Sequence, residues 1–435
     1  MGLCPTKSAT NIQDVTKSKL HVILPISNPM NFKVREQRFQ ECLQKLLKVA
    51  NINIIVVRLI YEGHSLLSVN RSKPYTELLI STTRENILWS KENLINIGVD
   101  YIKQHFTNNE VNESNQDRFY SEIFIAWIDA DIDFMNRSWV TDTIRELRAL
   151  EMNGNGSGGF VQLFSQANFL GPKNEIIKTL NSFCYQRALG KTYREVSNDH
   201  SDYWHPGFAW AATLHTLMKI NGGSGVENGS SYLIEKTIGG ADRHMAMSFL
   251  GLANQTVPDN VSQQYRYYIL NWQHIISSFD MKTSYVRGII NHYWHGDLIN
   301  RKYLERWQIL VKNNFIPDDF MYRGLSTGDR LLIYRNSNTQ LQKDIYQYFL
   351  ERNEDSNVVI GGKGNNNRGG NNGSRFNNNY NDSSNFYNSN DSNDSQSGGG
   401  NSHHHYHHHH HDDSNNYHHG GGTYDGGNSG WSGYG

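Results

Sequence analysis

The chain has 435 residues, of which 41 are basic and 42 acidic, and its formal net charge at pH 7 is −1. This balance, with no basic stripe in the sequence, argues against a dedicated nucleic-acid-binding protein. The three cysteines are too sparse for a disulfide framework, which favours a reducing compartment. The opening MGLCPTKSATNIQD lacks the apolar core of a signal peptide, and no apolar run reaches the ~18 residues of a transmembrane segment, so we expect a cytoplasmic protein.

The first part of the chain alternates apolar strands with amphipathic helices. A buried strand is predicted at 21–26, and the helical spacing of apolar residues predicts a helix at 35–50. A β-branched strand follows at 52–60, then a helix that begins near Lys91 and a strand at 122–128. This alternation predicts an α/β fold in which helices cover both faces of a mostly parallel central sheet.

The second half is less regular and richer in glycine and aromatic residues. Residues 159–164 are predicted to form another strand and residues 341–352 a last helix. After Ile360 the chain has no Leu, Ile, Val, Met or Ala, and it includes a histidine run from His403. Because such a segment cannot bury enough apolar surface to form a core, residues 357–435 are predicted to be a disordered tail.

Three acidic residues, Asp129, Asp131 and Asp133, alternate directly after the strand at 122–128. Carboxylates this close repel one another unless a cation or hydrogen bonds compensate. Ligands of parallel sheets bind beyond the carboxyl ends of the strands, and oxygen-rich ligation suits Mg²⁺ or Mn²⁺. We therefore predict a divalent metal site, which would neutralise a leaving diphosphate.

Three other interpretations of these acids compete with the metal site. A phosphatase that forms an aspartyl phosphate would have Thr or Val in place of Asp133, and a calcium loop of the EF-hand type would have glycine in place of Phe134. The third is a solvated strand end, in which Asp133 caps a helix that starts at about Trp139.

Several segments, taken in order, resemble a known family. After the first strands come KENLINIG, IDAD, HPGFAW, GGAD and WHG. Their order resembles that of GT-A glycosyltransferases and is similar in plan to the β-1,4-galactosyltransferase group, in a bacterial and viral branch with HPG-AWAA, GADRHMA and YWHG segments. The resemblance covers roughly residues 20–355. It implies a GT-A fold, a nucleotide-sugar donor (UDP above all), and Mn²⁺ or Mg²⁺ bound through a DXD motif.

The GGAD segment is the counterpart of a Gly-Gly-Glu-Asp segment in that family. The resemblance implies that Asp242 is the general base that accepts the proton of the acceptor hydroxyl. A single base opposite the leaving group implies inversion at the anomeric carbon. An ordinary helix-capping role for Asp242 is the alternative. Ala241 stands where the galactosyltransferases have an acid that contacts the acceptor sugar, so the resemblance does not identify the acceptor of this protein.

The resemblance also implies a metal-binding histidine near the WHG segment. If the strand continued through this segment, His292 and His295 would lie on opposite faces. We therefore expect only one of them to reach the metal and favour His295, because Gly296 frees the backbone there. Arg301 follows as a candidate to screen the diphosphate, and a solvated helix face explains it nearly as well.

The remaining candidates come from segments that should face the two substrates. The loop after the first strand should meet the base and ribose, and exposed aromatic rings can stack on sugars, although a packed core is the alternative for them. The expected donor-binding residues are Pro25, Ile26, Arg35, Lys91, Asp129 and Arg301; the acceptor-binding residues are Trp204, Phe208, Trp210, Gly240 and Arg243; the metal ligands are Asp131, His295 and His292.

The sequence thus predicts a metal-dependent, inverting hexosyltransferase that acts on a glycan, protein or other hydroxyl acceptor. A non-catalytic nucleotide-sugar-binding module is one alternative. The other is a GT-A-like nucleotidyltransferase, although HVILPISNPMNF lacks the Gly-rich, basic triphosphate loop that is usual there. The expected organisation is a flexible N-terminus (1–17), a nucleotide-sugar-binding half (18–135), an acceptor and catalytic half (136–320), a C-terminal helical extension (321–356) and the tail (357–435).

Overall fold

The computed structural model describes most of the region expected to fold. The described residues are 18–64, 73–107, 115–153, 156–193, 203–223, 231–296, 298–302, 305–324, 326, 329–337 and 339–355. The expected flexible N-terminus and the expected tail lie outside them. Every helix within the described ranges is too short or too polar to cross a membrane.

The main sheet is mostly parallel, as the alternation of strands and helices predicts. Within the described residues its strand order is β11-β6-β10-β4-β1-β2-β3, and β10 is antiparallel to both of its neighbours. The other pairings are parallel. These strands are β1 (Leu20–Ser27), β2 (Ile52–Tyr61), β3 (Thr76–Thr82), β4 (Phe124–Ile128), β6 (Gly159–Gln162), β10 (Ala209–Thr213) and β11 (Lys282–Tyr285).

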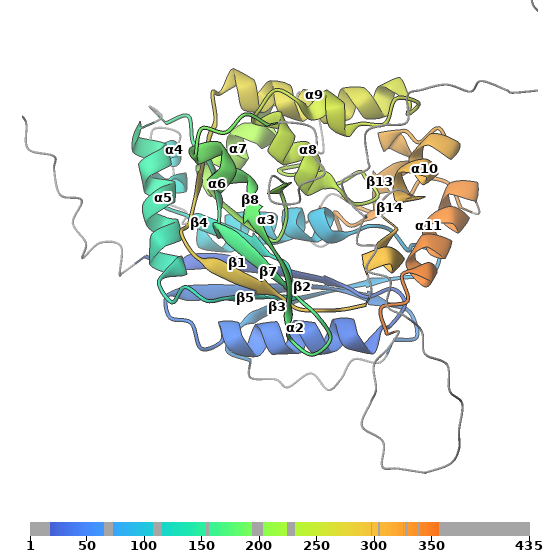
Figure 1. The fold of residues 1–435 in the computed structure, drawn as a ribbon. Helices are drawn as coiled ribbons and strands as arrows, with labels where there is room; N and C mark the ends of the chain where they lie inside the picture. Colours follow the sequence, from blue (N-terminus) through green and yellow to red (C-terminus); the bar gives the residue numbers. More distant parts are fainter. Residues whose placement is uncertain are drawn as a thin grey trace, which may run out of the picture. The chain divides into compact units, whose positions relative to one another are not determined.

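Helices cover both faces of this sheet, which confirms the predicted fold class. The helix α2 (Lys33–Leu46) lies on one face and α3 (Lys91–Phe106) on the other (Figure 1). Alternate residues of β1 supply the two cores: Ile23 packs on the α3 side and Leu24 on the α2 side. The packing against α3 is close, because a Cβ at Gly98 would lie 2.9 Å from the Ile23 side chain.

A second sheet, which the sequence analysis did not predict, lies next to the acidic segment. Its order is β5-β12-β7-β8-β9 within the described ranges. These strands are short, and single short runs carry little periodicity. They are β5 (Ile132–Phe134), β7 (Gln166–Leu170), β8 (Ile176–Ser182), β9 (Trp204–His205) and β12 (Ile289–His292); a separate pair is β13 (Phe320–Tyr322) with β14 (Leu332–Tyr334).

The remaining helices pack around these sheets (Figure 1). They are α4 (Gln116–Tyr120), α5 (Trp139–Asn153), α6 (Phe183–Ala188), α7 (Leu214–Gly223), α8 (Ala241–Ser248), α9 (Gln263–Ser278), α10 (Glu305–Lys312) and α11 (Gln340–Glu351), with the short 3₁₀ helices η2 (Ala253–Thr256), η3 (Leu298–Arg301) and η4 (Pro317–Asp319).

The end of the described chain is tied to the start of α2. The carboxylate of Asp355 accepts hydrogen bonds from the backbone N–H groups of Lys33 and Val34, at 3.0 and 2.9 Å. The first N–H groups of a helix have no partner within the helix, so Asp355 satisfies two of them. The segment after α11 is therefore held beside the carboxyl end of β1, from which α2 starts.

Candidate functional site

A cavity of about 490 Å³ opens beyond the carboxyl ends of β1 and β4. This is the position at which ligands of open parallel sheets bind. The segments that line it come from nearly the whole described chain: the ends of β1 and β4, the start of α3, the β7–β8 hairpin, the turn before β10, the start of α8, the loop after β12, α10 and the end of α11.

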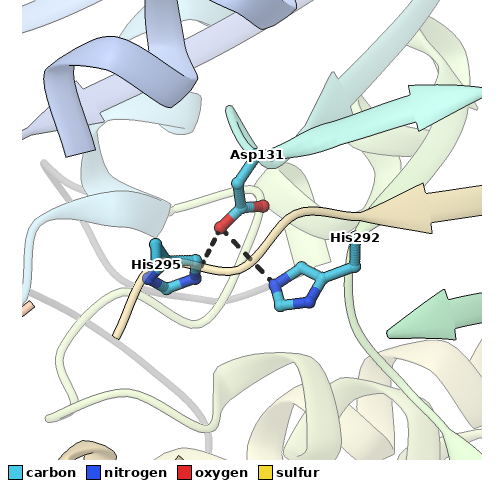
Figure 2. Close-up of side chains that lie close together, drawn as sticks. All are labelled: Asp131, His292 and His295. Atoms are coloured by element: carbon cyan, nitrogen blue, oxygen red, sulfur yellow. Dashed lines mark ion pairs between the residues drawn. The ribbon is translucent and has the colours of Figure 1, made fainter. Parts of the chain in front are cut away.

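Asp131, His292 and His295 meet at one side of this cavity. The carboxylate of Asp131 is directed at both imidazole rings (Figure 2), with its Oδ2 atom 2.8 Å from Nε2 of His295 and 3.6 Å from Nε2 of His292. Each residue offers one ligand atom, and these three atoms lie within 4.8 Å of one another. Burial lowers the pKa of His292 to about 4, so this imidazole is neutral and has a lone pair to offer.

These three residues fit a divalent cation. A metal with bonds of about 2.1 Å to ligands at right angles would place the ligand atoms about 3 Å apart, which lies between the 2.8 and 3.6 Å that separate Oδ2 of Asp131 from the two imidazoles. The second carboxylate oxygen of Asp131, Oδ1, is buried and has no hydrogen-bond partner among the described residues. A buried carboxylate oxygen without a partner is costly, and a bound cation would remove that cost.

Both histidines face Asp131, which differs from the expectation that only one would. The strand β12 ends at His292, so the alternation of a strand does not extend to His295. After it, the backbone N–H of Tyr293 donates to the carbonyl oxygen of Asp131 at 2.8 Å, and the chain bends at Gly296, whose φ is +92°. Because the hydrogen bond of Tyr293 holds the chain beside Asp131 after the strand has ended, the second imidazole reaches the same carboxylate.

The other two acids of the motif have separate partners. Asp129 forms an ion pair of 2.5 Å with Lys91, the first residue of α3, and both line the cavity. Burial raises the pKa of Asp129 to about 6 against the opposing effect of Lys91. Asp133 is paired with Lys45 on α2 at 2.7 Å. Asp133 also lies inside β5, well before the first residue of α5, so it is not the helix cap that the solvated-strand-end interpretation expects.

Asp242 lies in the first turn of α8, on the cavity wall. Gly239 and Gly240 precede it with φ values of +74° and +77°, a conformation that favours glycine. Its Oδ1 atom accepts the backbone N–H of Arg243 at 2.9 Å. A Cβ at Gly207 would lie 2.7 Å from its Oδ2 atom, so the carboxylate occupies space that only a glycine at this position leaves free.

Cationic side chains surround the acids. The guanidinium Nη2 of Arg301, on η3, lies 2.9 Å from Nε2 of His295. A concentration of guanidinium groups in a partly enclosed cavity suits phosphate, which Arg binds with paired hydrogen bonds. The basic residues that line the cavity are Arg35, Arg38, Lys91, Lys178, Arg243, Arg301, Arg306 and Arg352.

Of the three expected aromatic residues, only Phe208 reaches the main cavity. Its ring stacks on His205 with the ring centroids 4.1 Å apart. Trp204 is buried against Phe183, and Trp210 donates its indole N–H to the carbonyl oxygen of Pro206 at 2.7 Å. The packed-core alternative therefore describes these two tryptophans, although Trp210 also lines a smaller adjoining cavity with Asp242.

The structure brings together every expected donor-binding and metal-binding residue, along with Phe208, Gly240, Arg243 and Asp242. It also adds residues that the sequence analysis missed. Glu92 lies in the KENLINIG segment and His205 in the HPGFAW segment, so the resemblance could have identified both as candidate site residues. Phe169 and Tyr203 carried none, because the short strands and turns that hold them were not predicted. The main additions are Trp89, Glu92, Phe169, Tyr203, His205 and Arg306.

No family model and no curated protein matches this sequence. Solved structures do show similarity. Glucosyl-3-phosphoglycerate synthase from Mycobacterium tuberculosis, in complex with Mg²⁺ and UDP, is 11% identical, with 71% of this chain and 83% of that chain covered and a TM-score of 0.28. A complex of that enzyme with Mn²⁺, UDP-glucose and phosphoglyceric acid is 9% identical over 72% and 83%, with a TM-score of 0.24. A structure described as a mycobacterial protein is 12% identical over 78% and 90%, with a TM-score of 0.31. At these scores, a functional assignment rests on the geometry of the site itself.

Proposed function

We propose that this protein is a metal-dependent glycosyltransferase of the GT-A type, which transfers a sugar from a nucleoside diphosphate donor to an acceptor hydroxyl. One observation carries the proposal: three possible metal ligands (Asp131, His292 and His295) and a separate carboxylate, Asp242, line the same cation-rich cavity at the carboxyl ends of parallel strands. A phosphate-bearing donor and an attacking hydroxyl need these groups together. The segment resemblance favours UDP as the nucleotide.

Asp131, His292 and His295 are the residues that would hold the divalent cation, Mn²⁺ or Mg²⁺. Bound there, it would neutralise negative charge on the diphosphate as the sugar departs. Lys91 and Asp129 stand next to this cluster as an ion pair. In the proposal Lys91 supplies positive charge on the donor side, and Asp129 holds its ammonium group in place.

The donor is proposed to lie between the end of β1 and the guanidinium groups. Pro25 and Ile26 border the cavity where the base and ribose would sit, and Arg35 lies behind them on α2. Arg301, whose guanidinium contacts His295, would contact the phosphates. The walls of the cavity would exclude water from the anomeric carbon and so limit hydrolysis of the donor.

The acceptor is proposed to enter from the side of α8 and the turn before β10. Asp242 would accept the proton of its attacking hydroxyl, and a single base opposite the leaving group gives inversion. Gly240 lets the backbone come close to the acceptor, while Arg243 and the ring of Phe208 border the same side. We assign Trp204 and Trp210 a packing role. A glycan or a protein hydroxyl suits this site.

A screen of nucleotide sugars tests the proposal. The thermal unfolding midpoint of the full-length chain is measured with each donor, with and without Mn²⁺, and reaction products are then identified by mass spectrometry. We expect one donor to stabilise the protein only with the metal, followed by slow release of a nucleoside diphosphate. Metal-dependent binding with no turnover in any acceptor mixture would favour the non-catalytic module, and release of pyrophosphate from a nucleoside triphosphate would favour the nucleotidyltransferase.

A further inference from the structure

Glu354 is a buried carboxylate that follows the last helix, and it lies beside His295, one of the three possible metal ligands. It is 2% exposed, although it stands close to the end of the described chain. Its Oε2 atom accepts a hydrogen bond from Nε of Arg35 at 2.8 Å, and its Oε1 atom accepts one from Nε of Arg352, also at 2.8 Å. Both arginines line the cavity. Burying a charged carboxylate is costly in free energy, and the hydrogen bonds from the two arginines offset this cost.

The imidazole of His295 lies between this carboxylate and that of Asp131. Its Nδ1 atom is 3.8 Å from Oε2 of Glu354, and its Nε2 atom is 2.8 Å from Oδ2 of Asp131. The distance to Glu354 is longer than a hydrogen bond, so this carboxylate acts on the Nδ1 side of the ring through its negative charge. The Nη2 atom of Arg301 also lies 2.9 Å from Nε2, and because a guanidinium group can only donate, Nε2 carries the lone pair and the proton belongs on Nδ1. A bound cation would take this lone pair, and Arg301 would then turn to the phosphates of the donor.

Packing and hydrogen bonds hold the backbone around Glu354 in place. A Cβ at Gly296 would lie 3.0 Å from the Cα atom of Glu354, so the turn after His295 packs directly on the Glu354 backbone. The next residue, Asp355, is bonded to the first N–H groups of α2. The segment 352–355 is therefore fixed to α2 on one side and to the histidine turn on the other.

We propose that Glu354 is a positioning residue for the metal centre. Its carboxylate favours the tautomer of His295 with the proton on Nδ1 and directs the Nε2 lone pair at the cation, while it fixes Arg35 and Arg352 in the cavity wall. Carboxylates that orient ligating histidines act in this way in metal sites generally. The proposal rests on metal binding by Asp131, His292 and His295, which is part of the proposed function.

Titration of the full-length chain with MnCl₂ alone tests this, with free Mn²⁺ counted by electron paramagnetic resonance. Asp131→Asn measures the background, which includes the histidine run from His403. Above that background, Glu354→Gln should weaken Mn²⁺ binding by ~10–100-fold. Glu354→Asp, which keeps the charge, should recover part of the loss. The matched control is Glu351→Gln, at a partly exposed carboxylate paired with Lys302; it should bind like the parent. Circular dichroism monitors folding.

The outcomes separate the two proposals. If the parent binds no more Mn²⁺ than Asp131→Asn, the metal centre itself is wrong, and the role of Glu354 falls with it. If the parent exceeds that background and folded Glu354→Gln binds with parental affinity, the metal centre stands and Glu354 is not a positioning residue. Should Glu354→Gln fail to fold, Glu354→Asp decides: weakened binding supports the proposal, and parental affinity overturns it.

Discussion

The Nε2 atom of His295 lies 2.8 Å from the Oδ2 atom of Asp131, although the two residues follow strands of different sheets. At this separation a lone pair on the imidazole and a carboxylate oxygen repel each other unless a proton or a metal ion lies between them. The neighbouring imidazole of His292 extends the arrangement to three possible ligands.

Changing Asp131 to Asn should abolish Mn²⁺-dependent donor binding. The amide keeps the size of the side chain but removes the charge and one good oxygen ligand. Isothermal calorimetry with a nucleoside diphosphate, with and without Mn²⁺, measures the effect. Asp133→Asn is the matched control, because this acid is paired with Lys45 and does not line the cavity. Parental, metal-dependent binding by Asp131→Asn would place the metal elsewhere.

Changing Asp242 to Asn should separate binding from chemistry. The amide cannot accept the proton of the attacking hydroxyl, and general-base catalysis contributes typically ~10²–10⁴-fold. Turnover should fall by about that factor while donor affinity changes little. Transfer rate and calorimetric donor affinity are measured at one pH and at saturating Mn²⁺. An equal loss of both would make Asp242 a structural cap, and unchanged turnover would remove it, and the inverting assignment, from the mechanism.

Changing Gly207 to Ala should slow turnover without loss of metal binding. The new Cβ would lie 2.7 Å from Oδ2 of Asp242, so the carboxylate must move away from its position on the cavity wall. A displacement of about 1 Å at a reacting group can cost ~10²-fold in rate. Gly222→Ala serves as the control, since nothing lies within 4 Å of a Cβ there. Parental turnover by Gly207→Ala would show that this contact does not position the base.

Changing Glu92 to Gln should alter the dependence of stability on pH. Burial raises the pKa of Glu92 from 4.5 to about 7, so between these values the folded state binds more protons than the unfolded state. The free energy of unfolding of the parent should then fall as pH rises through this window, by roughly 1.4 kcal/mol per pKa unit.

The Glu92→Gln variant removes this dependence and keeps an acceptor for the indole N–H of Trp89, which donates at 2.9 Å. Relative to the parent it should gain stability from pH 5 to pH 7.5, as urea unfolding at the two pH values would reveal. The exposed Glu62→Gln is the control. A difference between Glu92→Gln and the parent that stays constant with pH would contradict the raised pKa.

Two truncations should have opposite effects. Ending the chain after Ser356 should leave folding and donor binding intact, because Val358, Val359 and Ile360 are the only aliphatic residues that it removes, too few for a core. Ending it after Leu350 removes Arg352, Glu354 and Asp355, so Mn²⁺ affinity should drop and the unfolding midpoint should fall. Circular dichroism melts and Mn²⁺ titrations compare the two. Loss of the fold in the longer form would mean that the tail is structural.

The sequence by itself determined the framework of the main sheet. The strands β1, β2 and β4 and the helices α2 and α3 were predictable because long apolar or amphipathic runs record their periodicity locally. The position of Asp129 and Asp131 at the carboxyl end of β4 followed from the same local pattern. The edge strand β3, with its mixed polar composition, and the short strands of the second sheet left no comparable signal.

Only the tertiary structure decided how the site is assembled. The pairing of both histidines with Asp131 depends on where β12 ends and on the hydrogen bond that then ties Tyr293 to the backbone of Asp131. The burial of Glu354 beside His295 depends on the return of the last segment to α2. Such contacts join residues that are far apart in the chain, and their geometry is set by packing between elements. Local spacing records which residues share a strand or a helix face, and it carries no information about which distant segment will pack against them.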